Sequence, residues 1–232
     1  MSRYKNLFID LDDTLWDTFH NNKECLYEAL YQPCNMERYY PSFEHFFEVY
    51  YAHNNQLWAQ YRRGEIDRDF LIIDRFRYVL TSAGITETEK ILTINKHFLT
   101  LSTKKKGLIE GSLDLLDYLR PRYRLFILSN GFREVQSKKL ENSGLSPYFE
   151  EIILSEDINV QKPHKDLFDY AVRKNNCKLE ESMIIGDSWE ADIQGGYNAH
   201  MDQLWFNPNQ EKPRNFNPTY TVMNLSAIKK IL

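Results

Sequence analysis

Two carboxylates, Asp10 and Asp12, stand two residues apart at the point where a short apolar run ends. The run, residues 7–9, is typical of a buried strand, and strand alternation stops at its end, so both side chains can turn toward one site. In such a pair one carboxylate can attack an electrophile while the other carries a proton or helps to hold a metal ion. Asp-rich loops are also common turn chemistry, so this pair alone leaves catalysis and a simple turn both open.

Three further polar clusters follow later in the chain, and two of them also come directly after apolar runs, at residues 125–128 and 183–185. The residues of interest in these clusters are Ser129, Asn130, Gly131, Lys162, Asp187 and Asp192. Taken singly, each has an ordinary interpretation as a turn, a surface lysine or a helix N-terminal acid. Their repeated placement after strands is more informative, because open α/β sheets bind ligands at the carboxyl ends of their strands.

The elements that must position these residues alternate between strand and helix. The expected strands are 7–10, 125–129, 152–154, 183–186 and 203–206, and the expected helices are 112–119, 132–143, 166–175 and 192–198, with a short closing helix at 225–232. Alternation of this kind predicts an α/β fold with a doubly wound parallel sheet.

Residues 18–106 show helical periodicity without a clear strand, and they interrupt the α/β pattern. Helices are expected at 22–31, 42–63, 67–83 and 87–101, with Gly64 and Gly84 between them. We therefore predict a catalytic core formed by residues 1–17 and 107–232, and an inserted all-helical domain at 18–106. The insert is rich in aromatic residues, for which the core of a small bundle is favoured over stacking on a ligand.

Composition excludes several classes of protein. The chain has 232 residues, a net charge of −4 and three scattered cysteines, Cys25, Cys34 and Cys177. This argues against a disulfide framework, a zinc site and a general nucleic-acid-binding surface. The N-terminus lacks the pattern of a signal peptide, and the sequence has no apolar stretch long enough to cross a membrane. A cytoplasmic protein is expected.

Taken together and in this order, the four polar clusters resemble the motifs of the haloacid dehalogenase (HAD) superfamily, whose core is Rossmann-like. The resemblance covers roughly residues 4–17 and 107–210, and it implies that the helical insert is a cap domain. The wording of the first motif, residues 8–17, and of the last, residues 186–196, is most similar to the pyrimidine 5′-nucleotidase branch, whose members hydrolyse nucleoside monophosphates.

The resemblance implies roles for the first residues named above. Asp10 would be the nucleophile and form an aspartyl-phosphate, and Asp12 would protonate the leaving oxygen and then activate water. Ser129, with the backbone N–H groups of Asn130 and Gly131, would bind the phosphoryl oxygens at the start of a helix.

The same site needs positive charge beside Asp10, because its carboxylate would otherwise repel the phosphate. Lys162 would supply part of that charge. Asp10, Asp187 and the backbone carbonyl of Asp12 suit a hard octahedral ion that keeps some of its water, so Mg²⁺ is the expected cofactor. Asp192 would bind the ion through water or orient Asp187.

Four more residues carry expectations. Thr14 would brace the catalytic loop through its hydroxyl beside the substrate. Trp16 and Phe19, just past that loop, are expected to face the substrate cleft for stacking or shielding from water. His200 stands where the family usually has a glycine in a tight turn, and histidine tolerates a positive φ better than most residues.

The leading hypothesis is thus a Mg²⁺-dependent phosphatase that acts on small monophosphates, in particular pyrimidine nucleotides. A phosphoglycolate or sugar-phosphate phosphatase, a β-phosphoglucomutase-like phosphomutase and a catalytically silent binding protein remain as alternatives. Carbon–halogen-cleaving members of the superfamily lack an acid/base Asp at the position of Asp12, so its presence favours a phosphatase. The expected partner is a small-molecule phosphate monoester, without a nucleic acid polymer or a membrane, and the expected state is a monomer or a homodimer.

Overall fold

The computed structural model describes residues 3–232, which form two compact units. One unit, here the α/β unit, runs through Thr18 and resumes at Lys106 to end at Leu232. The other, the helical unit, spans Phe19–Lys105. Within the described residues no helix combines the length and the apolar character needed to span a membrane.

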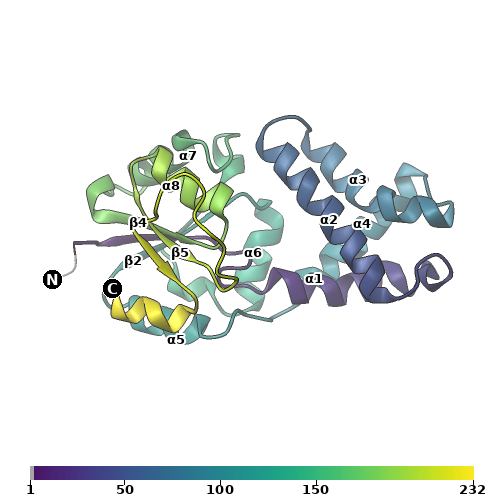
Figure 1. The fold of residues 1–232 in the computed structure, drawn as a ribbon, viewed down its shortest axis with the longest axis horizontal. Helices are drawn as coiled ribbons and strands as arrows, with labels where there is room; N and C mark the ends of the chain where they lie inside the picture. The colour runs from purple at the N-terminus through teal and green to yellow at the C-terminus, as the bar shows by residue number, and fades with distance from the viewer. Residues whose placement is uncertain (1–2) are drawn as a thin grey trace. The chain divides into compact units, whose positions relative to one another are not determined.

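Six strands of the described chain form one parallel sheet in the α/β unit (Figure 1), in the order β3-β2-β1-β4-β5-β6. They are β1 (Asn6–Ile9), β2 (Arg124–Ser129), β3 (Glu151–Leu154), β4 (Ser182–Gly186), β5 (Asp202–Phe206) and β6 (Tyr220–Val222). The predicted doubly wound parallel sheet is confirmed. The sequence did not predict β6, a three-residue strand that pairs with β5 at the edge of the sheet.

Alternation along β1 explains how the sheet is covered on both faces. Leu7 and Ile9 pack into one hydrophobic cluster with α5 (Ser112–Leu119) and the C-terminal helical segment Leu225–Lys230. Phe8 points the other way and packs with α7 (Lys165–Lys174). Both faces of the strand are therefore buried, as expected for a central strand of a parallel sheet.

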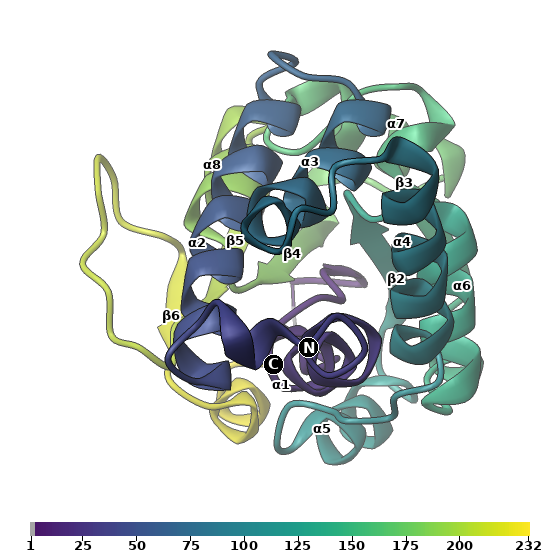
Figure 2. The ribbon, with the colours of Figure 1, turned by 90° about the vertical axis from the view of Figure 1, so that its right-hand side faces the viewer.

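The helical unit contains α1 (Thr18–Leu26) apart from its first residue, and all of α2 (Phe43–Arg62), α3 (Arg68–Leu80) and α4 (Thr88–Ser102). Helix α3 packs against both α2 and α4 (Figure 2). Two of these helices begin at N-cap residues: the side chains of Ser42 and Asp67 accept hydrogen bonds from the first turns of α2 and α3.

Most aromatic residues of the helical unit form its core, as the sequence favoured. Phe46, Phe47 and Tyr50 are buried in one cluster, and Tyr40 packs against it. Four aromatic residues of this unit are exposed instead, namely Tyr27, Tyr39, Phe70 and Tyr78. The high aromatic content thus serves the packing of the helices.

Candidate active site

The order of the strands brings the predicted residues to one edge of the sheet. Asp10 follows β1, Ser129 ends β2 and Asp187 follows β4. Because β1 pairs in parallel with both β2 and β4, the three residues lie at neighbouring strand ends. This is the switch point of the doubly wound sheet, where such folds bind ligands.

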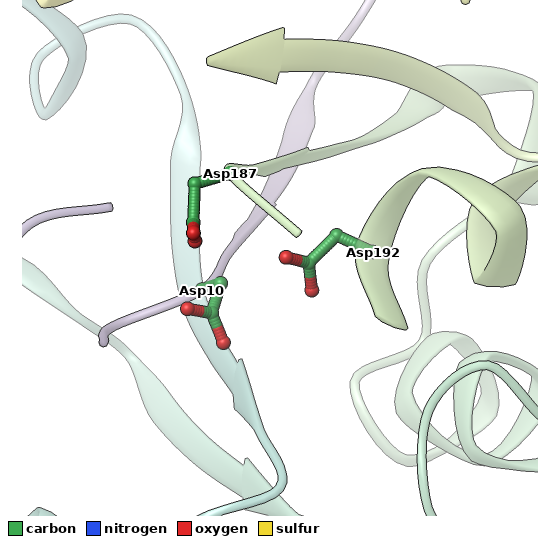
Figure 3. Close-up of side chains that lie close together, drawn as sticks. All are labelled: Asp10, Asp187 and Asp192. Atoms are coloured by element: carbon green, nitrogen blue, oxygen red, sulfur yellow. The ribbon is translucent and has the colours of Figure 1, made fainter. Parts of the chain in front are cut away.

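Asp10, Asp187 and Asp192 form a cluster of carboxylates, each offering an oxygen within 4.8 Å of the others. Figure 3 shows the three side chains lying close together, with the carboxylates of Asp187 and Asp192 directed toward Asp10. Asp192 lies on the helical turn Trp189–Ile193, and it reaches the cluster by passing over Gly186. A Cβ atom on Gly186 would overlap the Asp192 carboxylate, so glycine is required at the end of β4.

Lys162 lies against two of these carboxylates. Its Nζ atom is 2.6 Å from Asp10 Oδ1, 2.6 Å from Asp192 Oδ1 and 2.6 Å from the carbonyl oxygen of Leu128. The residue is only 1% exposed. Burial alone would lower the pKa of the Lys162 ammonium, but the charges of Asp10 and Asp192 outweigh burial and raise it, so the group stays protonated.

When ionised, the three carboxylates of the cluster carry more negative charge than Lys162 offsets. Burial raises the pKa of Asp10 to about 7, with Lys162 acting in the opposite direction and Asp192 adding to the rise. Burial and the charges of Asp10 and Asp192 raise the pKa of Asp187 well above its usual range. Carboxylate oxygens with surplus negative charge are the donor set that a hard divalent cation requires. The residues present therefore fit a bound Mg²⁺.

Thr14 holds Asp187 in this cluster. Its hydroxyl donates to Asp187 Oδ1 at 2.9 Å and accepts from the Asp187 backbone N–H at 3.1 Å. Thr14 is fully buried. The expected bracing role thus has a specific form, because this hydroxyl ties the loop after β1 to the end of β4.

Asp12 turns toward a different set of groups. Its Oδ1 accepts hydrogen bonds from Lys139 Nζ at 2.5 Å and from the Thr18 hydroxyl at 2.7 Å, and its Oδ2 accepts from Gln136 Nε2 at 2.7 Å. Burial would raise the pKa of the Asp12 carboxyl, but the charge and hydrogen bond of Lys139, with the other donors, outweigh it and lower that pKa.

Sequence reasoning missed both Gln136 and Lys139. They lie on α6 (Arg133–Asn142), the helix after β2, and both are buried. Their positions in the sequence could have indicated this, because they share a helical face with the apolar residues Val135 and Leu140. A polar side chain on a buried face needs a hydrogen-bonding partner.

Asn130 contacts Lys162 in a way that the sequence did not predict. Its side-chain amide donates to the Lys162 carbonyl oxygen at 3.0 Å, and its Oδ1 accepts from the Lys162 backbone N–H at 2.8 Å. The adjacent Gly131 N–H donates to Ser129 Oγ at 3.0 Å. The Ser129–Gly131 segment therefore positions the lysine as well as offering groups to a phosphate.

One expectation needs correction. Trp16 does not face a cleft: it is fully buried in the core of the α/β unit, where Lys139 Nζ lies 4.1 Å from the centroid of its ring. Proximity to the catalytic loop in sequence was a poor guide for Trp16, because its ring buries more apolar surface in the core. Phe19 is partly exposed and packs edge-on against Phe47 and Tyr51 of the helical unit, and its role beside the substrate stays a prediction.

His200 follows the prediction for its turn. It has a φ of 57°, in the left-handed region, and lies on the surface after α8 (Gln194–Asn198). The loss of the usual glycine is thus accommodated locally.

With this geometry in place, the model of the haloacid dehalogenase-like hydrolase family matches residues 7–206. The chain belongs to this family. The match includes Asp10, Ser129 and Asp187, and it also includes the helical unit. The predicted family and the predicted enzyme class, a phosphohydrolase of the HAD type, are confirmed.

Individual members of the family are similar over most of the chain. The HAD-hydrolase YfnB of Bacillus subtilis is 34% identical over 100% of this chain and 97% of its own length. Its crystal structure, described as bound to magnesium and as revealing interdomain movement, has a TM-score of 0.88 with 31% identity, covering 99% of both chains.

Two pyrimidine 5′-nucleotidases are also similar. YjjG of Escherichia coli is 31% identical over 80% of this chain and 82% of its own length. PynA of Streptococcus pneumoniae is 31% identical over 94% of this chain and 91% of its own length.

Proposed function

We propose that this HAD hydrolase is a Mg²⁺-dependent phosphatase that forms an aspartyl-phosphate on Asp10, and that its substrates are pyrimidine nucleoside 5′-monophosphates. The observation that carries the mechanism is the buried contact of Lys162 with Asp10 beside Asp187. A carboxylate nucleophile at a strand end, held by an ammonium group and next to a second carboxylate, suits attack on a phosphoryl group.

In the first half of the reaction, an oxygen of Asp10 attacks phosphorus and the bond from phosphorus to the ester oxygen breaks. Asp12 gives a proton to that leaving oxygen. Lys162 offsets charge on Asp10, and Ser129 with the backbone N–H groups after it binds the phosphoryl oxygens. The nucleoside leaves as a neutral alcohol.

In the second half, water attacks the phosphorus of the aspartyl-phosphate, and the bond to Asp10 breaks. Asp12, now a carboxylate, takes the proton from this water. Inorganic phosphate leaves and Asp10 is again free. Splitting the hydrolysis in this way replaces one slow displacement by two faster ones.

Asp10 and Asp187 would hold the Mg²⁺ ion, together with the carbonyl oxygen of Asp12. Both oxygens of Asp192 already have partners, Lys162 Nζ and the Ser188 backbone N–H, so Asp192 fits the role of orienting the site. Bound Mg²⁺ supplies charge that neutralises the carboxylates and the phosphoryl oxygens in the transition state.

The substrate class is supported by the similarity to YjjG and PynA, both named as pyrimidine 5′-nucleotidases. Asp12 supports phosphate-ester over carbon–halogen cleavage, because an alkoxide leaving group needs a proton whereas a halide does not. The five groups Asp10, Asp12, Ser129, Lys162 and Asp187 also argue against a silent binding protein.

Phosphate release from a panel of monoesters tests this proposal. The panel contains UMP, dUMP, dTMP, purine monophosphates, phosphoglycolate and hexose phosphates, each measured with Mg²⁺ and with EDTA. We expect release that requires Mg²⁺ and is fastest for the pyrimidine monophosphates. Faster release from phosphoglycolate or a hexose phosphate would keep the mechanism and refute the substrate class. No release from any compound would refute the activity.

The variant Asp10→Asn tests the nucleophile. Turnover is expected to fall below detection, and intact-protein mass after an acid quench should show no phosphorylated enzyme, because an amide cannot attack phosphorus. Circular dichroism should show that the variant is folded. Normal turnover by this variant would show that another group is the nucleophile.

A further inference from the structure

Two of the three donors that contact the Asp12 carboxylate come from one helix, α6. Gln136 and Lys139 are three residues apart, so they share a face of the helix. Gln136 contacts Oδ2 and Lys139 contacts Oδ1, and the Thr18 hydroxyl is the third donor. Both oxygens of Asp12 thus accept hydrogen bonds: the Lys139 ammonium and the Gln136 NH₂ group can only donate, and the Thr18 hydroxyl also donates here.

Gln136 joins Asp12 to the phosphate-binding segment. Its Nε2 atom donates to Asp12 Oδ2 and to Ser129 Oγ, each at 2.7 Å. Ser129 Oγ also accepts from the Gly131 N–H at 3.0 Å. Both described hydrogen bonds of this hydroxyl are accepted ones, which leaves its own proton to donate to a phosphoryl oxygen.

The buried position of Gln136 destabilises the folded protein, so a role other than stability is needed to explain it. The residue is fully buried, and within residues 3–232 its Oε1 atom has no hydrogen-bond donor. A buried amide oxygen without a partner is unfavourable. Gly131 also lacks the Cβ atom that would overlap the Gln136 side chain. The position of the Gln136 amide between Asp12 and Ser129 thus leaves its Oε1 atom unpaired, and it requires a glycine at position 131.

Lys139 is held in the same way. Its side chain is 7% exposed, and the Nζ atom lies between Asp12 Oδ1 at 2.5 Å and the ring of Trp16, 4.1 Å from its centroid. A buried ammonium is costly unless it is paired, and the face of an aromatic ring is a favourable second neighbour. Trp16 therefore supports the lysine, and the lysine supports the carboxylate.

We propose that Lys139 and Gln136 are positioning residues that hold Asp12 in the orientation from which it takes a proton from the attacking water. The inference rests on the proposed function. It assigns the hydrogen bonds around Asp12 to the second half-reaction, the hydrolysis of the aspartyl-phosphate. Because all three neighbours of Asp12 are donors, the orientation seen is that of an accepting carboxylate, as the second half-reaction requires. There the bond from phosphorus to Asp10 breaks, and the water proton passes to Asp12.

Lys139→Met is the first test, because methionine keeps the volume of the buried side chain and removes its charge and donors. We expect kcat to fall about 10- to 100-fold, less than the roughly 10²- to 10⁴-fold that a general base contributes, because Asp12 itself remains. Phosphorylated enzyme should accumulate during turnover, measured by intact-protein mass after an acid quench. The kcat values for UMP and p-nitrophenyl phosphate should converge, because hydrolysis of a common intermediate then limits both.

Matched variants separate positioning from general damage. Lys138→Met alters an exposed lysine next in sequence on α6 and should leave kcat within twofold of the parent. Lys139→Arg keeps charge and donors and should restore part of kcat. Gln136→Met should reproduce the accumulation of phosphorylated enzyme, and it provides the test if Lys139→Met fails to fold.

Three results would overturn the inference: unchanged kcat in Lys139→Met and Gln136→Met, a fall in kcat without phosphorylated enzyme, or an equal fall in Lys138→Met. Failure of the proposed function is distinguishable, because the parent enzyme would then release no phosphate from any monoester and Asp10 would never be phosphorylated. A parent that turns over normally while both variants match it refutes the positioning role alone.

Discussion

A buried lysine between two aspartates decides the electrostatics of this site. Lys162 contacts Asp10 and Asp192, and its side chain is 2% exposed. A pair of this kind contributes little net stability compared with an apolar pair, but removing one partner leaves the other charge buried and unpaired. Without the lysine, the charges of Asp10 and Asp192 would be buried and unpaired. They would also lie close to Asp187, whose carboxyl already has a raised pKa.

Replacing Lys162 by methionine should therefore damage both folding and catalysis. We expect the free energy of unfolding in urea to fall by about 3–5 kcal/mol, the usual cost of breaking a buried ion pair. Phosphate release should fall at least about 100-fold, because the ammonium no longer offsets charge on Asp10.

Lys165→Met is the control for that variant, since the Lys165 side chain is 58% exposed and lies a few residues away. Its unfolding free energy should stay within about 0.5 kcal/mol of the parent. If Lys162→Met were as stable and as active as Lys165→Met, the buried contact would have neither role.

For single residues, the sequence predicted the position in the site correctly where the residue lies at the end of a strand. Asp10, Ser129 and Asp187 could be placed at one edge because parallel strands end together. Gln136 and Lys139 could not, since their contact with Asp12 depends on the rotation of α6 about its axis and on side-chain rotamers. The prediction for Trp16 was wrong for a related reason: the sequence does not show which side of its loop is buried and which is exposed.

Among the elements, two loops at the edge of the sheet are tied together by one side chain. The loop after β2 carries Asn130, whose amide pairs with both backbone groups of Lys162 on the segment between β3 and α7. This double contact fixes where the Lys162 side chain enters the site. It works as a backbone pair would, with one donor and one acceptor on each side.

Asn130→Ala tests this link. Removing the amide leaves backbone groups of Lys162 without partners in a partly buried place, so we expect a loss of about 1–3 kcal/mol in unfolding free energy. The kcat for phosphate release should fall more than KM rises, because the lysine acts on the reacting groups.

The exposed residue Asn209 provides the comparison. Asn209→Ala should change neither unfolding free energy nor kcat measurably. Equal, small effects in both variants would mean that the segment around Lys162 keeps its place without Asn130.

The elements themselves were predictable when their sequence was strongly patterned. The predicted strands β1–β5 coincide with the structure to within one residue at each end, because continuous apolar runs mark buried strands. β6 was missed because it has three residues with mixed exposure and follows a polar loop. Its position is determined by pairing with β5, a long-range interaction that local pattern does not reveal.

For the molecule as a whole, the two ends of the α/β unit that flank the insert are hydrogen-bonded directly to each other. Trp16 and Leu108 form an antiparallel bridge, the Asp17 N–H donates to the Gly107 carbonyl at 3.1 Å, and the Ile109 N–H donates to the Leu15 carbonyl at 2.9 Å. The chain thus leaves and re-enters the α/β unit side by side. Each unit also has its own hydrophobic core.

This geometry makes removal of the helical unit a practical experiment. Residues 19–105 would be replaced by a glycine-rich link of about two to four residues, the length that closes adjacent antiparallel segments. We expect the shortened chain to fold cooperatively, as shown by thermal unfolding, and to bind Mg²⁺. It should hydrolyse p-nitrophenyl phosphate, because Asp10, Asp12, Lys162 and Asp187 all belong to the α/β unit.

What the shortened chain should lose is discrimination among substrates. If the helical unit selects the nucleoside, the ratio of kcat/KM for UMP to that for AMP will fall toward one, while the Asp10→Asn version remains inactive. An unchanged preference for UMP would place base recognition in the α/β unit. It would direct the search for specificity to the loops after β2 and β4, which carry the catalytic groups.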